Sequence, residues 1–238
     1  MMSVATATSA TRTTRGRATR LLLAGGVIGP PLFTLVYLVE GATRPGYDAW
    51  QQTVSALSLG EQGWLQVASF LVCGLLSLGF AAGSRVALRG GPGATWGPRV
   101  LAIFGLGLIV AGIFATDPAQ GYPPGTPLGP SVVTTVHGTV HFLLGGLPVF
   151  AAMPAACGIL ARRFAATRAW GWVWYSVGSG ILALTCFVAF AVLGVRGGPA
   201  GLLERCSLVV GLAWLTALAV RLLRATDAPG GASRDLSV

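Results

Sequence analysis

Six long apolar stretches constrain the fold of this chain more than any other feature. A helix needs about 20 apolar residues to cross the roughly 30 Å hydrocarbon core of a bilayer, where its backbone groups can bond only to one another. The six stretches that meet this requirement are Leu21–Val39, Trp64–Gly83, the segment between Arg99 and Asp117, about His137–Leu160, Ala169–Val195 and the segment between Arg205 and Arg221. The sequence therefore predicts an all-α, polytopic integral membrane protein with six transmembrane helices.

The composition agrees with a lipid environment and argues against a nucleic-acid partner. Apolar residues make up 53% of the chain and charged residues only 10%, against roughly 25% charged residues in a soluble domain. A net charge of +9 would suggest nucleic-acid binding in a soluble protein, but the basic side chains here are arginines whose placement follows the predicted loops. The four scattered cysteines do not form the pattern of a disulfide framework.

The arginines predict the orientation of the spans. If the spans alternate in direction, only Arg44, Arg196 and Arg205 lie on the side opposite the N-terminal tail. An excess of arginine marks cytoplasmic loops, so we expect both termini in the cytoplasm and the protein in the cell (inner) membrane. The sixth span also requires Arg205 and Arg221 to extend their side chains to the membrane surface. The arginines on the majority side are Arg12, Arg15, Arg17, Arg20, Arg85, Arg89, Arg99, Arg162, Arg163, Arg168, Arg221, Arg224 and Arg234.

The chain divides into one membrane domain and two tails. Residues 1–20 contain Thr, Ser, Ala and Arg without an acidic residue, a composition typical of a disordered basic cytoplasmic tail. Residues 21–223 form the transmembrane domain, and 224–238 a second disordered cytoplasmic tail. We interpret Leu21–Val39 as a membrane anchor, because it is longer than the apolar core of a signal peptide and no small-x-small cleavage site follows it.

Small residues spaced four apart predict close helix packing. Such pairs let helix backbones approach each other in lipid, and they also leave open a homo-oligomer or a partner subunit bound through glycine-rich faces. Pro148 and Pro154 are expected to bend the fourth helix, since each removes a backbone donor. The spaced pairs are Gly25 with Gly29, Gly79 with Gly83, and Gly107 with Ala111.

The first external loop predicts a short interfacial helix. Asp48 can cap a helix whose third position is Gln51, and Gly60 can end it. The helix would be amphipathic and would lie along the outer interface or over the mouth of the bundle. Its apolar face would present Trp50, Val54 and Leu57, and its polar face Gln51, Ser55 and Ser58.

The loop after the third span leads to the only two histidines of the chain. Five prolines in the fourteen residues from Asp117 to Pro130 make this loop stiff and non-helical. His137 and His141 follow it, four residues apart and therefore on one face of a helix. We expect Asp117 and both imidazoles to lie at a similar depth in the outer leaflet.

Three interpretations of this cluster remain open. Asp117, His137 and His141 could bind a metal such as zinc, which would activate water at an open position. Ser55 could act as a nucleophile, with a histidine as base and Asp117 orienting it. The same groups could instead only tie the loops to the helix ends by hydrogen bonds. A haem between two histidines of one chain is not expected, because both share one helix face.

The loop motifs resemble those of a bacterial six-helix membrane family, common in actinobacteria, known as domain of unknown function 998. The resemblance implies the fold and a membrane location, but no activity. The chain departs from the pattern at Ser69, where relatives often carry asparagine, and at Ala115, where they often carry proline. The likeness runs from about Arg44 to His141, and the six-span layout extends it to about Leu223. The matching segments are Val54–Gly60 followed by Gly63 and Trp64, Phe114–Pro118, Gly121–Pro127 and His137–His141.

A looser resemblance concerns membrane hydrolases of the alkaline-ceramidase type. These enzymes also combine a serine, an aspartate and histidines near one leaflet, which implies metal-dependent hydrolysis. They use seven helices and three histidines, whereas this chain has six predicted spans and two histidines.

These observations lead us to expect a polar pocket in the outer leaflet that binds a lipid headgroup or another small amphiphile. Ser55 and Asp117 are its candidate catalytic residues, and Asp117, His137 and His141 its candidate metal ligands. A metal-dependent intramembrane hydrolase acting on lipid-like substrates is one alternative, and a non-catalytic scaffold or partner subunit is another. The further candidate ligand-binding residues are Tyr47, Gln51, Ser58 and Tyr122.

Overall fold

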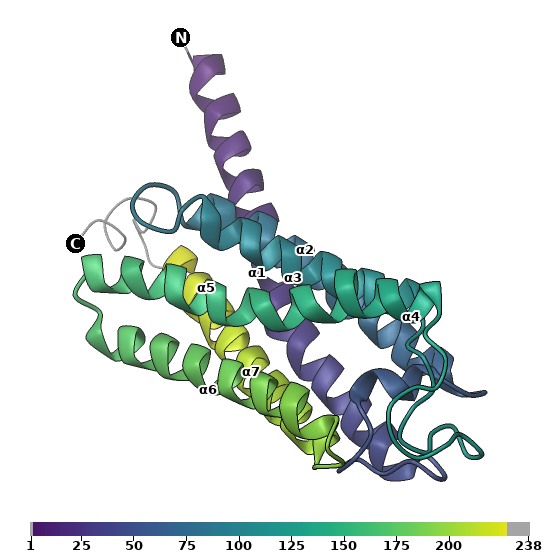
Figure 1. Ribbon diagram of the computed structural model, residues 1–238. Coiled ribbons are helices and arrows are strands. Elements are labelled where there is room, and N and C mark those ends of the chain that lie inside the picture. Colours follow the sequence, from purple (N-terminus) through teal and green to yellow (C-terminus); the bar gives the residue numbers. More distant parts are fainter. Residues whose placement is uncertain (1, 228–238) are drawn as a thin grey trace.

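The computed structural model describes the backbone of residues 2–227 and the side chains of residues 16–226. This part of the chain is helical, without a β-strand, and its long helices lie side by side as rods (Figure 1). The helices are α1 (Met2–Thr43), α2 (Gly63–Ala87), α3 (Trp96–Ile113), α4 (Val136–Val140), η2 (His141–Gly146), α5 (Leu147–Ala166), α6 (Trp170–Gly194) and α7 (Ala200–Asp227), with a one-turn 3₁₀ helix, η1 (Val54–Ser58), after α1.

Six helical segments are long and apolar enough to cross a membrane, which confirms the predicted fold class. They cover residues 16–43, 63–87, 96–113, 136–166, 170–194 and 200–226. The sixth segment is longer than predicted, because the helix continues past Arg205 at one end and past Arg221 at the other.

The six rods form a closed ring in chain order. Each rod packs against its neighbours in sequence, with α4, η2 and α5 acting as one rod, and α7 returns to pack against α1. Short connections between antiparallel neighbours produce this arrangement. We call the end with the α5–α6 turn the terminal end, and the end with η1 and residues 114–135 the loop end.

Glycines at the predicted positions allow the helix backbones to approach closely. A Cβ atom on Gly25 would lie 2.4 Å from the carbonyl oxygen of Leu76, and one on Gly107 would lie 2.9 Å from that of Gly145. A Cβ atom on Gly83 would likewise lie 3.0 Å from the Cβ atom of Leu22 and from the backbone nitrogen of Leu23. These small residues therefore serve helix contacts within the chain.

The fourth span is irregular directly before its first proline. Residues His141–Gly146 form a π-helix, in which Leu147 donates its backbone N–H to Phe142 five residues earlier. Pro148 follows in the first turn of α5 and has no N–H to donate. A π-turn accommodates such a break in the α-helical hydrogen-bond pattern. His141 is the first residue of this π-turn.

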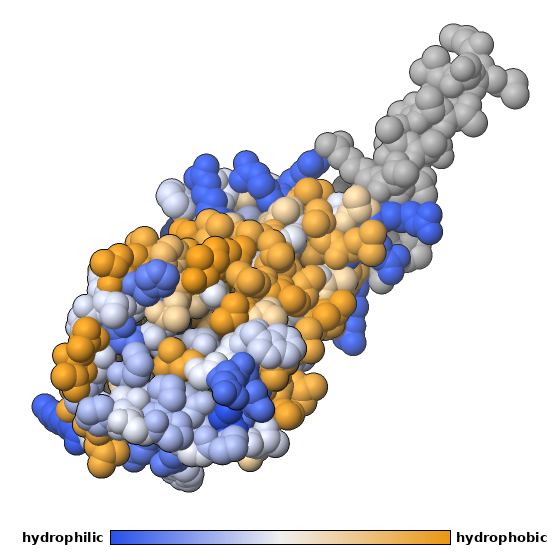
Figure 2. All heavy atoms as spheres, turned by 90° about the vertical axis from the view of Figure 1, so that its right-hand side faces the viewer, coloured by the Kyte–Doolittle hydropathy of each residue, from blue (hydrophilic) through white to orange (hydrophobic). Residues whose placement is uncertain are grey.

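The predicted tails have different outcomes. α1 begins at Met2, so the backbone of residues 2–20 is helical. This segment is the first of the two predicted tails. Most of the second predicted tail, residues 228–238, lies outside the described residues. Figure 2 faces the loop end and shows hydrophilic residues gathered over the loops, beside the hydrophobic flanks of the helices.

Candidate functional site

Arg205 on α7 holds the first half of the loop between α1 and α2. Its Nη1 donates to the carbonyl oxygens of Ala49 and Gln52, each at 2.9 Å, and to that of Gly201 in its own helix. Its Nη2 donates to the hydroxyl of Tyr47, whose ring also lies 5.5 Å from the guanidinium carbon. Arg205 is only 8% exposed, because it bonds to the carbonyl groups of this loop, so the loop covers the guanidinium at this end of α7.

Arg44 holds the second half of the same loop. It donates to the carbonyl oxygens of Leu57, Leu59 and Gln62 at 3.2–3.3 Å. It also pairs with Glu40 one turn earlier in α1 and reaches the hydroxyl of Tyr122 at 3.4 Å. A guanidinium offers five donors in a fixed plane, and this geometry lets one buried side chain satisfy several carbonyl groups that would otherwise be unpaired.

η1 takes the place of the amphipathic helix predicted between Asp48 and Gly60. Thr53 caps it by accepting from the N–H of Ala56, and the carboxylate of Glu204 accepts from the N–H of Val54 at 2.6 Å. Val54 and Leu57 are buried in the core rather than at the membrane interface. The longer helix does not form, because the loop carbonyls bond to Arg44 and Arg205 instead of to backbone N–H groups.

The predicted ligand-binding residues of this loop mostly serve it internally. Tyr47 donates its hydroxyl to the carbonyl of Thr53 at 2.8 Å, and burial raises the pKa of Tyr47, so the hydroxyl stays protonated. Ser58 donates to the carbonyl of Ser55 at 2.7 Å. Gln51 is half-buried, and Tyr122, from the loop after α3, is buried with its hydroxyl accepting from Arg44 at 3.4 Å.

Asp117 lies at the N-terminus of α4 and orders it. Its carboxylate accepts from the backbone N–H of Thr135 at 3.0 Å and from the hydroxyl of Thr135 at 2.6 Å. Thr135 is the N-cap of α4 and accepts from the N–H of Gly138. A negative charge at this place interacts favourably with the helix dipole. A Cβ atom on Gly138 would lie 2.0 Å from Oδ2 of Asp117, so the carboxylate fits only because residue 138 is glycine.

His141 is buried against the C-terminal end of α3. Its Nδ1 lies 2.7 Å from the carbonyl oxygen of Phe114 and 3.2 Å from that of Ala111. Because carbonyl oxygens only accept, Nδ1 carries the proton, and in the neutral ring Nε2 carries the lone pair. His137 is exposed, and its ring packs on the ring of Phe114 at 5.4 Å. Both histidines thus contact Phe114, as expected for one shared face.

The structure does not bring the predicted metal ligands together. Within residues 16–226, no group of three His, Cys, Asp or Glu side chains could hold a metal ion. Asp117 bonds to Thr135 and His141 bonds to Phe114, so the two face different partners. Ser55 lies in η1, where its hydroxyl bonds to that of Thr53 at 3.4 Å; no hydrogen bond joins it to either histidine.

A second group of polar side chains lies deeper in the bundle, and of its members only His141 was predicted as a site residue. We call Tyr37, Glu40, Gln66, Ser69 and His141 the polar layer. Gln66 is fully buried, and neither the nitrogen nor the oxygen of its amide has a hydrogen-bond partner. Three other buried polar atoms also lack a hydrogen-bond partner: the hydroxyls of Tyr37 and Ser69 and one carboxylate oxygen of Glu40. The available signal was a glutamine inside an apolar span, where a polar side chain is costly.

Ring contacts place the members of the polar layer within neighbouring helical turns at the loop end of the bundle, with His141 the deepest. Phe33 of α1 packs on Phe70 of α2 with 5.3 Å between ring centroids, and Phe70 packs edge-on against His141 at 6.3 Å. Tyr37 and Gln66 each lie one turn from this contact toward the loop end, because α1 and α2 run antiparallel. Both therefore lie at the same depth in the bundle, just inside the two arginines.

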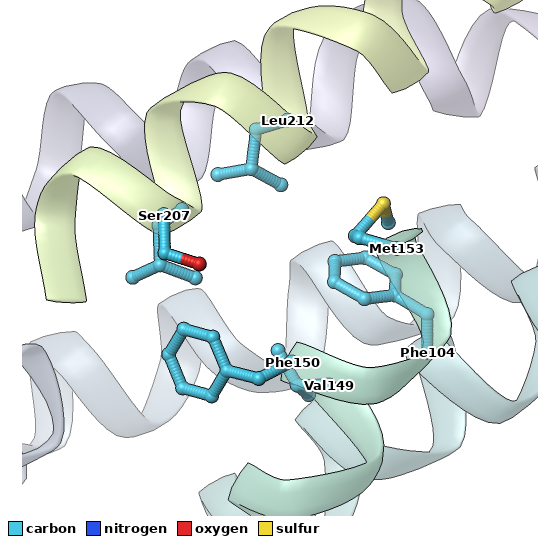
Figure 3. Close-up of a pocket in the computed structure, with 7 residues that line it drawn as sticks. Phe104, Val149, Phe150, Met153, Ser207 and Leu212 are labelled. Carbon is cyan, nitrogen blue, oxygen red and sulfur yellow. The ribbon is translucent and has the colours of Figure 1, made fainter. Parts of the chain in front are cut away.

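A small apolar hollow lies farther from the loops, between α3, α5 and α7 (Figure 3). Phe104, Val149, Phe150 and Met153 line it from α3 and α5, and Leu212 from α7. Ser207 supplies a polar atom to the lining, and its hydroxyl already donates to the carbonyl of Ala183 at 2.8 Å. The hollow therefore lacks the unpaired polar groups of the polar layer.

Comparison with known proteins places the chain in a family and assigns no activity. No curated protein and no solved structure matches the chain. One family model matches residues 27–221, which include the last part of α1 from residue 27 to 43, all of α2 to α6 and most of α7. Because the match covers most of the sequence, the chain belongs to the family described as protein of unknown function, DUF998.

Proposed function

We propose that this multi-pass membrane protein binds a small amphiphile at the loop end, with the polar headgroup in the polar layer. The observation that carries the proposal is Gln66, which is fully buried while both atoms of its amide lack a hydrogen-bond partner. A buried polar group without a partner costs about 1–3 kcal/mol. The hydroxyls of Tyr37 and Ser69 add to this cost.

A bound headgroup would remove much of this cost. Gln66 can donate and accept, the hydroxyls of Tyr37 and Ser69 can do both, and Glu40 has an acceptor oxygen to spare. The two arginines nearby already bond to carbonyl oxygens and to Tyr47, Tyr122 and Glu40. The unpaired groups are therefore mainly neutral, and they suit hydroxyl or amide groups of a lipid better than a phosphate.

The metal-dependent hydrolase is a weaker alternative. It would require Asp117 to leave Thr135, and His141 to turn away from Phe114, before either could bind a metal. A scaffold or partner subunit needs no such change, and it is the alternative if the polar layer holds only water.

We also infer that the loop end faces away from the cytoplasm. At the terminal end the exposed arginines are Arg17, Arg20, Arg85, Arg89, Arg99, Arg162, Arg168 and Arg224. At the loop end, among residues 16–226, only Arg196 is exposed, since Arg44 and Arg205 are buried. The difference between the two ends is therefore larger for exposed arginines than for all arginines in the sequence. This difference supports a cytoplasmic location of the termini.

Native mass spectrometry of the protein purified with its membrane lipids tests the proposal. The wild type is expected to carry a lipid adduct that Gln66→Leu loses. Ser207→Ala is the matched control, because Ser207 is also buried but already bonded and lies outside the polar layer. A wild type without an adduct, or an adduct that persists in Gln66→Leu, would overturn the proposal.

A further inference from the structure

We propose that the segment Leu128–Val136 lies in the membrane interface at the loop end and inserts four aliphatic side chains among the lipids. We call this segment the apolar arm. Its proposed occupant is the lipid surface itself, and this contact is independent of the ligand proposed for the polar layer.

The apolar arm leaves four aliphatic side chains exposed. The side chains of Leu128, Val132, Val133 and Val136 are 89%, 77%, 66% and 76% exposed. Single exposed apolar residues are common on protein surfaces, but four of them within the short segment 128–136 are typical of a contact with a membrane or another molecule.

Charge does not oppose insertion of the apolar arm. No Asp, Glu, Lys or Arg occurs between Asp117 and Arg162. The remaining residues of the arm are Gly, Pro, Ser and Thr, which cost little at the headgroup level of a bilayer.

The arm continues directly into the lipid-facing surface of the fourth span. Val136 begins that span, and Phe142, Leu143 and Leu144 of η2 are each about half exposed on it. Asp117 fixes the end of the arm through Thr135, and Gln120 fixes its beginning by donating its N–H to the carbonyl of Gly129 at 2.8 Å. Both anchors hold the arm beside the point where the fourth span enters the membrane.

The backbone of the arm limits how deep it can lie. The residues before Val136 are not in a helix or strand, so their N–H and C=O groups need water or headgroups as partners. The structure therefore favours shallow insertion, with the side chains in the acyl region and the backbone at the headgroup level.

Spin labels on the full-length protein in lipid nanodiscs test the depth of the arm. Cys186→Ala and Cys206→Ala remove the two native cysteines that are not buried, and Val132→Cys or Val133→Cys then carries the label. We expect both labels to collide with oxygen dissolved in the bilayer and to be shielded from a water-soluble nickel chelate. Glu61→Cys is the control, because Glu61 is exposed in the loop before α2, and its label should contact the chelate.

Two results would overturn the proposal. Labels at Val132 and Val133 that contact the chelate as strongly as the label at Glu61 would place the arm in water. Shielding that appears only when several copies share a membrane, and disappears in nanodiscs with one copy, would identify a second copy of this chain as the occupant. Because all three positions are exposed, we expect the labelled variants to keep the wild-type melting temperature, which checks their folding.

Discussion

The carboxylate of Asp117 holds Thr135 through two hydrogen bonds, and Thr135 in turn caps the helix that carries both histidines. Asp117 lies just after α3, and Thr135 is the N-cap directly before the fourth span, so this contact joins two rods across a loop. An acidic residue that the sequence suggests as a metal ligand is therefore part of a helix N-terminus. Its chemical role here is to accept from backbone and hydroxyl donors.

Removing the carboxylate should destabilise the protein without requiring any metal. Asp117→Ala leaves the N-terminus of α4 without its charged acceptor, and hydrogen bonds to a charged group contribute about 1.5–3 kcal/mol. We expect a loss of that size in the free energy of unfolding, measured by denaturant titration in detergent, and a smaller loss in Asp117→Asn. Asp48→Ala is the control, because Asp48 accepts from the N–H of Trp50 within a loop and does not bond to the N-cap of a membrane-spanning helix. Equal stability of Asp117→Ala and wild type would contradict the capping role.

A methyl group at position 138 should also destabilise the protein, because it would overlap the carboxylate of Asp117. In Gly138→Ala the Cβ atom would overlap Oδ2 of Asp117 at 2.0 Å, so the carboxylate must move, at a cost of about 1–3 kcal/mol. Gly158→Ala is the matched control, because a Cβ atom there meets nothing within 4 Å. Thermal unfolding of both variants distinguishes the two sites. If the clash with the carboxylate is the cause, the double variant Asp117→Ala/Gly138→Ala loses less stability than the sum of the losses in the two single variants.

The sequence predicts the six spans well because each span depends on a continuous apolar run that needs no distant partner. It does not predict how Arg205 is buried, since Ala49 and Gln52 lie more than 150 positions away in the chain. It places His141 on the same face as His137, but the π-turn and the carbonyl of Phe114 determine where the ring ends up. Short-range patterns carry the first kind of information, and only the packed bundle carries the second.

Lysine should not replace the arginine that holds the first loop. A lysine ammonium is a compact charge without the planar fork of donors, so Arg205→Lys cannot reach Ala49, Gln52 and Tyr47 together. We expect a loss of roughly 1.5–3 kcal/mol in unfolding free energy and faster hydrogen exchange across residues 49–58. Arg196→Lys, at an exposed position, should change stability by less than about 0.5 kcal/mol. Unchanged exchange in Arg205→Lys would show that the loop does not depend on this contact.

The two histidines should differ sharply in their contribution to stability. His141→Ala removes the donor to the carbonyls of Phe114 and Ala111 at a buried site, at a cost of about 1–3 kcal/mol. His137→Ala should cost less than about 0.5 kcal/mol, because His137 is exposed. His141→Asn places an amide donor near the position of Nδ1 and should recover part of the loss, whereas His141→Gln should not. Thermal unfolding of the four variants tests this order, and equal losses for both alanine variants would contradict it.

Tyr47 should make the stability of the protein fall at alkaline pH. Burial raises the pKa of Tyr47 in the folded state above its ordinary value of 10.0, so the folded protein retains this proton at pH values where the unfolded chain has lost it. The contribution is fully present below about pH 10 and decreases as the pH rises further, by up to about 1.4 kcal/mol per pH unit. Unfolding free energies measured between about pH 8 and pH 11 should therefore fall more steeply in wild type than in Tyr47→Phe, which has no phenol to titrate. Parallel curves for wild type and Tyr47→Phe would show that this hydroxyl does not remain protonated under the loop.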